Sequence, residues 1–396
     1  MRLRPGIRRA GLYTGGFLGP FGGGMVVVLV PEFRDVFGVS TATAALAITA
    51  YLVPFALLQF VSGTLGERLG RDRVLRIAFA VYALASLAAA IFKTIEPFLI
   101  ARAIQGCANA FTSPLALAKL ADVTPPARLD KAMGAYASVQ TSGMLLAPLI
   151  GGAAGAIDYR LAFVIAAVAS LVLMVIVPEG SARPDRALAP RLRSAFTPRA
   201  MWMSASSSLF FLCTVGLAVV VSLKAADEFG VSSDGRGLLL AGFGFAGVFA
   251  GLLAGSLLER FGRSRVLVCG VISSAVVLSL LGFTTSSWSL AVVWFLTGLF
   301  TTFVATALVT LVVTASAVNR GGAISMIAAW RFVGGALAPV IWVPLYHASE
   351  HAAFSTAAGG TLIVLATALR ASSASDVRAD RPGSVVEAGD LAQEPQ

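Results

Sequence analysis

The stretch GTLGERLGRDRVL at residues 63–75 recurs as GSLLERFGRSRVL at residues 255–267, with the same spacing of Gly, Glu and Arg. Each copy lies in a short hydrophilic gap between two long apolar segments. The same offset of 192 residues relates the FGVS sequence at 37–40 to the one at 229–232. A repeat unit this long joins two helical bundles rather than stacking small units. The sequence therefore predicts two homologous halves.

The composition places both halves in a membrane. Hydrophobic residues make up 57% of the chain and charged residues 13%, and the mean hydropathy is +0.84. Such a composition is far more apolar than that of a soluble domain. Windows of about 20 apolar residues, enough to cross a hydrocarbon core of roughly 30 Å, fall near residues 12–32, 42–62, 74–92, 97–119, 132–154, 161–178, 202–223, 237–257, 266–283, 288–313, 322–345 and 352–370. The predicted fold is an all-α integral membrane protein with twelve transmembrane helices in two pseudo-symmetric six-helix halves.

Four units follow from these windows. Residues 1–178 and 201–370 are the N-terminal and C-terminal six-helix bundles, 179–200 is an Arg- and Pro-rich cytoplasmic linker, and 371–396 is a cytoplasmic tail. The tail has almost no large apolar residues and is predicted to be disordered. With both termini in the cytoplasm, 23 of the 30 Lys and Arg residues lie on the inner side and five on the outer side. This bias predicts the orientation of a multi-pass protein of a bacterial plasma membrane.

Several other functions are disfavoured. The net charge of +10 comes from basic residues scattered over many short loops, which is not the pattern of a nucleic-acid-binding face. No P-loop or Gly-x-Ser-x-Gly motif is present, so no enzyme activity and no cofactor are expected. His347 and His351 stand four residues apart beside Glu350 and could place two metal ligands on one helical turn. A solvated loop is the preferred interpretation, and no metal site is expected.

The repeated motif Gly-x-Leu-x-Glu-Arg-x-Gly-Arg resembles the signature loop of the major facilitator superfamily, whose duplicated halves each have six spans. The resemblance covers about residues 12–370, with Glu67 where the family usually has Asp. It implies a cytoplasmic gating loop in each half. The loop residues that it implies are Gly63, Glu67, Arg68, Gly70, Arg71 and Arg73 in the first copy and Gly255, Glu259, Arg260, Gly262 and Arg263 in the second.

In the family, the arginines of this loop pair with an acid that ends the fourth span. Asp122 stands at that point here, and the resemblance implies that it pairs with Arg71 or Arg73 as part of a gating latch. The alternative is that these arginines only set the membrane topology. The second copy has Thr314 at the position of Asp122, so the two halves are expected to have unequal latches.

Two arginines lie inside predicted spans. Arg102 and Gln105 belong to LIARAIQG at residues 99–106, which resembles a second family signature, seen in proton-driven members. An arginine in the hydrocarbon region costs about 2.5 kcal/mol or more unless it faces a partner or a cavity. Arg102 is therefore expected to face the bundle interior, with snorkelling to the membrane surface as the alternative. Arg331 lies well inside the eleventh span, matches no family signature and is expected to line the central cavity.

The fifth span carries GMLLAPLIGG at residues 143–152, which is similar to a signature of exporters that exchange substrate for protons. Small residues let helices approach closely, and a proline removes a helix hydrogen bond and permits a kink. The residues assigned to packing and hinge roles are Gly143, Pro148, Gly151, Gly152 and Pro339, which corresponds to Pro148 in the second half.

The acidic residues limit proton coupling. All 20 Asp and Glu residues fall in predicted loops, tails or span ends. Proton coupling normally uses a carboxylate or His that titrates inside the protein. Glu32, at the predicted outer end of the first span, is the remaining candidate. The alternative is an interfacial carboxylate paired with Arg34.

The resemblance implies a monomeric secondary active transporter that exports small lipophilic drugs or metabolites by alternating access, as a proton-coupled antiporter in the lipid bilayer. One alternative is a uniporter or exchanger of a small organic anion bound by Arg102 and Arg331. The lack of carboxylates within spans favours this alternative, and the signature in the fifth span opposes it. A non-transporting sensor or scaffold is a further alternative, for which the short loops offer no large soluble domain.

Overall fold

The structure is a computed structural model that describes residues 5–125, 128–176, 198–315 and 320–379. Within these residues the regular elements are helices, and no strand is present. The first half contains α1 (Pro5–Val27), α2 (Val30–Phe37), α3 (Thr41–Leu69), α4 (Arg71–Ile91), α5 (Ile95–Asn109), α6 (Thr112–Asp122), α7 (Leu129–Gly155) and α8 (Arg160–Ile176). The second half contains α9 (Pro198–Cys213), η3 (Val215–Leu217), α10 (Ala218–Asp227), α11 (Ser233–Phe261), α12 (Arg263–Leu281), α13 (Ser287–Ala315), α14 (Arg320–Ala348) and α15 (Glu350–Ala379).

A helix lies at each of the twelve predicted windows, but three windows are divided. The first is shared by α1 and α2, which bend by 57° at their junction. The fourth is divided between α5 and α6, and the seventh between α9, η3 and α10. Among the described residues, five helices are long and apolar enough to cross a membrane, or six if the bent pair is one span. The all-α prediction is therefore confirmed, and twelve crossings stay a prediction.

The sequence repeat is also a repeat of backbone geometry. Positive φ angles occur at Gly38 (63°) and Gly70 (91°) in the first half and at Gly230 (60°) and Gly262 (82°) in the second. Each residue of the second pair follows its counterpart by the same 192 residues as the loop motif. Glycine populates this region readily because it has no Cβ. The repeated glycines therefore set the same turns in both halves, before α3 and α4 in the first half and before α11 and α12 in the second.

Helix packing repeats in the same way. A Cβ added to Gly106 would overlap the carbonyl oxygen of Tyr51, and one added to Gly298 would overlap that of Phe243. Both members of the second pair lie 192 residues after those of the first. Small residues at helix crossings allow this close backbone approach, which is the main source of helix association in a membrane. The halves thus share one packing scheme.

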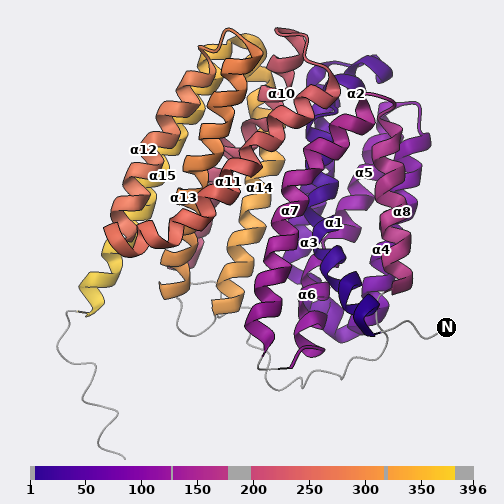
Figure 1. The fold of residues 1–396 in the computed structure, drawn as a ribbon, viewed down its shortest axis with the longest axis horizontal. Coiled ribbons are helices and arrows are strands. Elements are labelled where there is room, and N and C mark those ends of the chain that lie inside the picture. The colour runs from indigo at the N-terminus through magenta and orange to yellow at the C-terminus, as the bar shows by residue number, and fades with distance from the viewer. Residues whose placement is uncertain (1–4, 126–127, 177–197, 316–319, 380–396) are drawn as a thin grey trace, which may run out of the picture.

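The two halves meet along two helix pairs. Helix α7 packs against α11, and α3 packs against α14 (Figure 1). The glycine-rich end of α7 makes the closest contact, because a Cβ on Gly152 would lie 2.5 Å from the carbonyl oxygen of Ser233 and 2.9 Å from the Cα of Gly237. Gly143 and Gly151 face α1 instead, against backbone atoms of Phe17 and Met25. The signature of the fifth span therefore packs both within its half and across the boundary.

The first helix begins, and the last helix ends, at the same end of the bundle. In Figure 1, α1 begins and α15 ends at the lower end of the bundle, and α2 and α10 lie at the upper end. This upper end is called the outer end below, after the orientation that the charge distribution predicts. Pro148 and Pro339 are buried within α7 and α14, as expected for packing positions. A hinge movement at these prolines stays a prediction.

The predicted domain boundaries stay a prediction. Helix α15 extends beyond the predicted end of the second bundle at residue 370 and ends at Ala379. The rest of the tail and most of the predicted linker lie outside the described residues, and α9 begins at Pro198.

Replacing the glycine at a repeated crossing should destabilise the fold. We expect Gly106→Ala and Gly298→Ala each to lower the free energy of unfolding by about 1–3 kcal/mol, because the new methyl group meets backbone that cannot move independently. The measurement is thermal unfolding of the detergent-purified protein. Gly359→Ala is the control, since that exposed glycine of α15 has open space around it. Equal melting temperatures for all three variants would contradict the packing argument.

Candidate functional site

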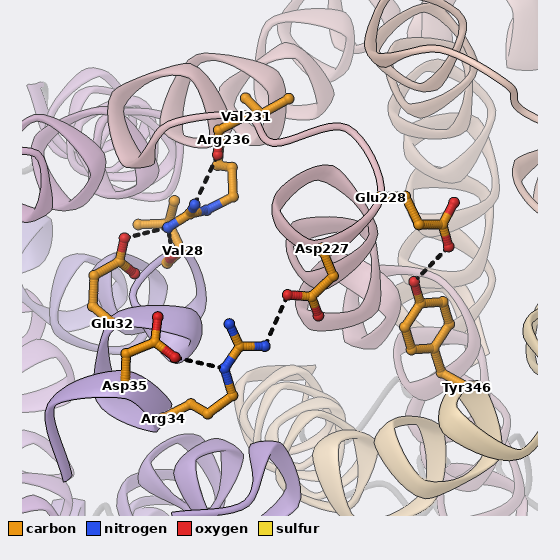
Figure 2. A network of polar contacts seen from close by, with 9 residues as sticks. All are labelled: Val28, Glu32, Arg34, Asp35, Asp227, Glu228, Val231, Arg236 and Tyr346. Carbon is orange, nitrogen blue, oxygen red and sulfur yellow. Dashed lines mark hydrogen bonds and ion pairs between the residues drawn. The ribbon is translucent and has the colours of Figure 1, made fainter. Parts of the chain in front are cut away.

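Ion pairs join the two halves at the outer end (Figure 2). Arg34 of α2 donates from Nη1 to Asp227 Oδ1 of α10 at 2.8 Å, and from Nε to Asp35 Oδ1 at 2.8 Å. Asp227 ends the second part of the broken seventh span, and Arg34 lies in the second part of the broken first span. The breaks in these spans therefore turn short helices toward one another across the boundary.

A second cross-half ion pair lies beside the first. Arg236, in the first turn of α11, donates from Nη2 to Glu32 and to the carbonyl oxygen of Val28 at 3.3 Å, and from Nη1 to the carbonyl oxygen of Val231 at 2.8 Å. Arg236 is buried. The alternative interpretation of Glu32 as a partner of Arg34 is wrong. Residues two apart on a helix point in nearly opposite directions, so Glu32 faces α11 and Arg34 faces α10.

The second half has its own polar cluster nearby. The hydroxyl of Tyr346 in α14 donates to Glu228 Oε1 at 2.9 Å (Figure 2). The buried Lys224 pairs with Glu350 and, at 3.4 Å, with Glu228. Burial raises the pKa of Glu350, while the hydrogen bond from Lys224 opposes this rise. This cluster ties α10, α14 and α15 together and so supports the helix that carries Asp227.

The two histidines do not share a helical turn. Helix α14 ends at Ala348 and α15 begins at Glu350, so His347 and His351 flank a break between helices. His351 lies against the ring of Phe283, with centroids 5.0 Å apart. Both histidines are exposed, and no group of three or more metal-ligating side chains occurs among the described residues.

Arg102 lies fully buried inside the first half. Its Nε donates to the carbonyl oxygen of Ala47 at 3.1 Å, both Nη atoms reach that of Gly22 at 3.3–3.4 Å, and Nη1 donates to Gln105 Oε1 at 2.6 Å. The guanidinium also covers the ring of Tyr51 at 4.3 Å. The prediction that Arg102 faces the bundle interior is confirmed. Its partners are all neutral and all belong to the first half.

Arg331 has a different environment at the boundary between the halves. Its guanidinium carbon lies 5.1 Å from the ring centroid of Phe211 in α9, and its side chain is partly exposed. The next residue, Phe332, meets Phe55 of α3 edge to face at 4.7 Å. Within the described ranges, Arg331 has no hydrogen bond or ion pair. The sequence identified the arginine but not the aromatic side chains from both halves around it.

The predicted inner loop contains the expected ion pair. Arg71 donates to Asp122 at the end of α6, and the buried Lys119 of α6 pairs with Asp72, a contact that the sequence did not reveal. Arg73 is exposed. Both ion pairs lie within the first half, and the gating role of this loop stays a prediction.

In the second copy of the loop, Glu259 and Arg260 are exposed, and Arg260 lies 5.4 Å from the ring of Phe261. In both copies, the predicted loop residues that are not described beyond their helical backbone are Gly63, Glu67, Arg68, Gly255 and Arg263.

Sequence reasoning missed the cross-half partners Arg236 and Asp227. One signal was present, because Arg236 is one of only five basic residues on the predicted outer side, where positive charge is disfavoured. For Arg236 this signal agrees with the cross-half partner that the structure shows.

Comparison with known proteins gives a consistent assignment. The sequence profile described as Major Facilitator Superfamily matches residues 12–224 and again residues 203–390. The quinolone resistance protein NorA of Staphylococcus aureus is 22% identical over 295 residues, which cover 72% of this chain and 76% of that protein. The uncharacterized MFS-type transporter EfpA of Mycobacterium tuberculosis is 30% identical over 152 residues, which cover 38% of this chain and 28% of EfpA.

Solved structures share the fold. A bacterial homolog of the human lysosomal transporter Spinster, in an inward-facing and occupied conformation, aligns with a TM-score of 0.77 at 16% identity, covering 92% of this chain and 96% of that one. A D-xylose–proton symporter aligns with a TM-score of 0.73 at 15% identity, covering 91% and 96%. At these identities the likeness concerns the fold alone.

Removing one cross-half ion pair should loosen the outer end. We expect Asp227→Asn to raise the labelling rate of Ser233→Cys by a membrane-impermeant maleimide about 1.5- to 5-fold, the range given by a partly exposed ion pair of about 0.2–1 kcal/mol. Ser233 is a suitable reporter because it is buried against Gly152 and Gly155 of the other half.

The labelling is done in a variant without the three native cysteines. Glu96→Gln is the matched control, since Glu96 is an exposed acid in the first turn of α5, outside this network. An equal labelling rate for Asp227→Asn and the control would show that the ion pair does not hold the halves together.

Proposed function

Because the chain belongs to the major facilitator superfamily, we propose that it is a proton-coupled antiporter of a bacterial plasma membrane that exports small lipophilic drugs or metabolites. Members of this superfamily are transporters and not enzymes, so the energy for transport comes from a gradient. The proposed mechanism is alternating access by rocking of the two halves.

The proposal rests on the contacts that close the outer end of the boundary between the two halves. These contacts are weak enough to break during transport. The ion pairs Arg34–Asp227 and Arg236–Glu32 cross between the halves beside the tight packing of Gly152 on Gly237. The partly exposed Arg34–Asp227 pair contributes only about 0.2–1 kcal/mol, so thermal motion can break it in every transport cycle, whereas the Arg236–Glu32 pair is more buried. We infer that the structure represents a conformation closed on the outer side.

The helix packing suits a rocking movement. Within each half, glycines such as Gly106 and Gly298 bring backbones into direct contact, which resists internal rearrangement. Between the halves, most helix contacts of the described residues lie on two pairs, α3 with α14 and α7 with α11, and fewer lie between α10 and α2 or α1. The least costly large movement is therefore one between the halves.

The export of lipophilic compounds is supported by the named relative. NorA is a quinolone resistance protein and shares 22% identity over most of both chains. The signature in the fifth span resembles that of exporters and lies at the boundary, where Gly152 packs against α11. Substrate identity is not transferred by fold, so the chemical class needs its own argument.

Glu32 is the proposed coupling residue. It is the carboxylate through which the first half holds the buried Arg236 of the second half, and its Oε2 has no hydrogen-bond partner among the described residues. Protonation would remove the negative charge that holds Arg236 and so would favour opening of the outer end. In the proposed antiport, the pair forms again only after this proton has left Glu32 toward the inner side, so one proton moves inward in each cycle.

The coupling proposal predicts separable defects for Glu32→Gln. In proteoliposomes that contain a pH-sensitive dye, we expect wild-type protein to move protons when a transported compound is added, and Glu32→Gln to reduce this movement at least tenfold. Exchange of labelled for unlabelled substrate should continue, because it needs no net proton movement. The test panel contains an aromatic acid, an aromatic alcohol and an aromatic amine, so it makes no assumption about substrate charge.

Glu96→Gln serves as the control for loss of an acid at the outer end. Unchanged proton movement in Glu32→Gln would exclude Glu32 as the coupling residue. Exchange of the aromatic acid by wild-type protein without any proton movement would favour the alternative of a uniporter or exchanger of organic anions. No flux of any panel compound by wild-type protein would contradict the transport proposal itself.

A further inference from the structure

The two arginines inside the membrane differ in what they can still bind. Every nitrogen of the Arg102 guanidinium donates to a carbonyl or amide oxygen, and the side chain has no exposed surface. Arg331 has no such partner within the described part of the chain and keeps an exposed fraction. Of the two, only Arg331 is placed to receive a ligand in this conformation.

The environment of Arg331 leaves its charge incompletely compensated. A guanidinium in the membrane region is unfavourable without a partner, and contact with one aromatic ring returns only part of the lost hydration. The carboxylates of the chain lie at helix ends and in loops, and Glu32 is already engaged by Arg236 at the outer end. An anion that enters from outside the chain would complete the site.

The fold itself does not require a cation at this position. At the offset of 191 residues that relates Pro148 to Pro339, the counterpart of Arg331 in the first half is Gln140. The same helix position is thus filled by a neutral amide in one half and by an arginine in the other. A structural role common to the two helices does not explain the charge, which points to a ligand.

Aromatic side chains from both halves lie close to this position. The ring centroid of Phe332 lies 4.7 Å from that of Phe55 of the first half and 6.4 Å from that of Phe211 of the second half. Phe211 also lies beneath the Arg331 guanidinium. A planar guanidinium can bind both oxygens of a carboxylate, and adjacent ring faces accept an aromatic group.

We propose that Arg331 recognises the carboxylate of an aromatic organic acid and that Phe55, Phe211 and Phe332 contact its ring. The inference rests on the proposed function as a transporter and names the substrate class for the same boundary between the halves. A substrate held by side chains of both halves is sensitive to their relative movement, which is what alternating access requires.

The experiment compares three naphthalene compounds with the same ring and different charge. Binding of 1-naphthoate, 1-naphthylmethanol and 1-naphthylmethylamine to the purified full-length protein is measured by calorimetry, and their exchange is measured in proteoliposomes. Wild-type protein should bind the carboxylate at least tenfold more tightly than the alcohol. Arg331→Gln should remove this preference with little change in affinity for the alcohol.

Arg160→Gln is the control for loss of a positive charge, since Arg160 is a partly exposed residue at the start of α8, away from Arg331. If Arg331→Gln does not fold, Arg331→Lys provides the test. Lysine keeps the charge without the two-donor fork, so it should weaken naphthoate binding about threefold to tenfold.

Two results would overturn the inference: equal binding of naphthoate and the alcohol by wild-type protein, or unchanged naphthoate binding in the Arg331 variant that folds. Exchange of the alcohol or the amine would in that case still support a transporter. Absence of exchange for all three compounds would instead contradict the proposed function.

Discussion

Close contact between helix backbones is the constraint on which the rest of the structure depends. A membrane gives no hydrophobic driving force between helices, so their association relies on packing at small residues. Gly106 against Tyr51 and Gly298 against Phe243 are the same contact made once in each half. These contacts make each half a rigid unit, and the functional residues are positioned relative to that unit.

The rigidity of the halves explains why chemistry concentrates at their boundary. Glu32, Arg236, Arg34 and Asp227 lie on short helices or first turns next to the boundary, where a change of charge alters contacts between the halves. The same groups placed within a half would be locked by backbone packing, as Arg102 is. Residues next to the boundary can therefore change their contacts when a ligand or proton binds, whereas residues packed inside one half cannot.

The sequence predicted features that depend on local spacing. The repeated loop indicated the two halves, and the resemblance to the family implied the pairing of Asp122 with Arg71 or Arg73, of which the structure contains the pair with Arg71. The break after Asn109 was missed, although Pro114, in the first turn of α6, marks it by removing the helix hydrogen bond to the carbonyl oxygen of Ala110. The pairing of Glu32 with Arg236 also escaped prediction, since it depends on how α2 is rotated toward α11, which no local pattern encodes.

The internal repeat shows which charges the fold can do without. Arg102 covers the ring of Tyr51 at 4.3 Å, and at the equivalent positions of the second half Trp294 covers Phe243, with centroids 4.9 Å apart. A flat side chain satisfies the packing in both cases, and the charged guanidinium of Arg102 also donates to the carbonyl oxygens of Ala47 and Gly22 within its half. The same comparison sets Arg331 against Gln140 and Asp122 against Thr314. Symmetry thus defines the scaffold, and each departure from it marks a charge that needs its own explanation: structural for Arg102, whose partners lie within its half, and functional for Arg331, which has no hydrogen-bond or ion-pair partner among the described residues.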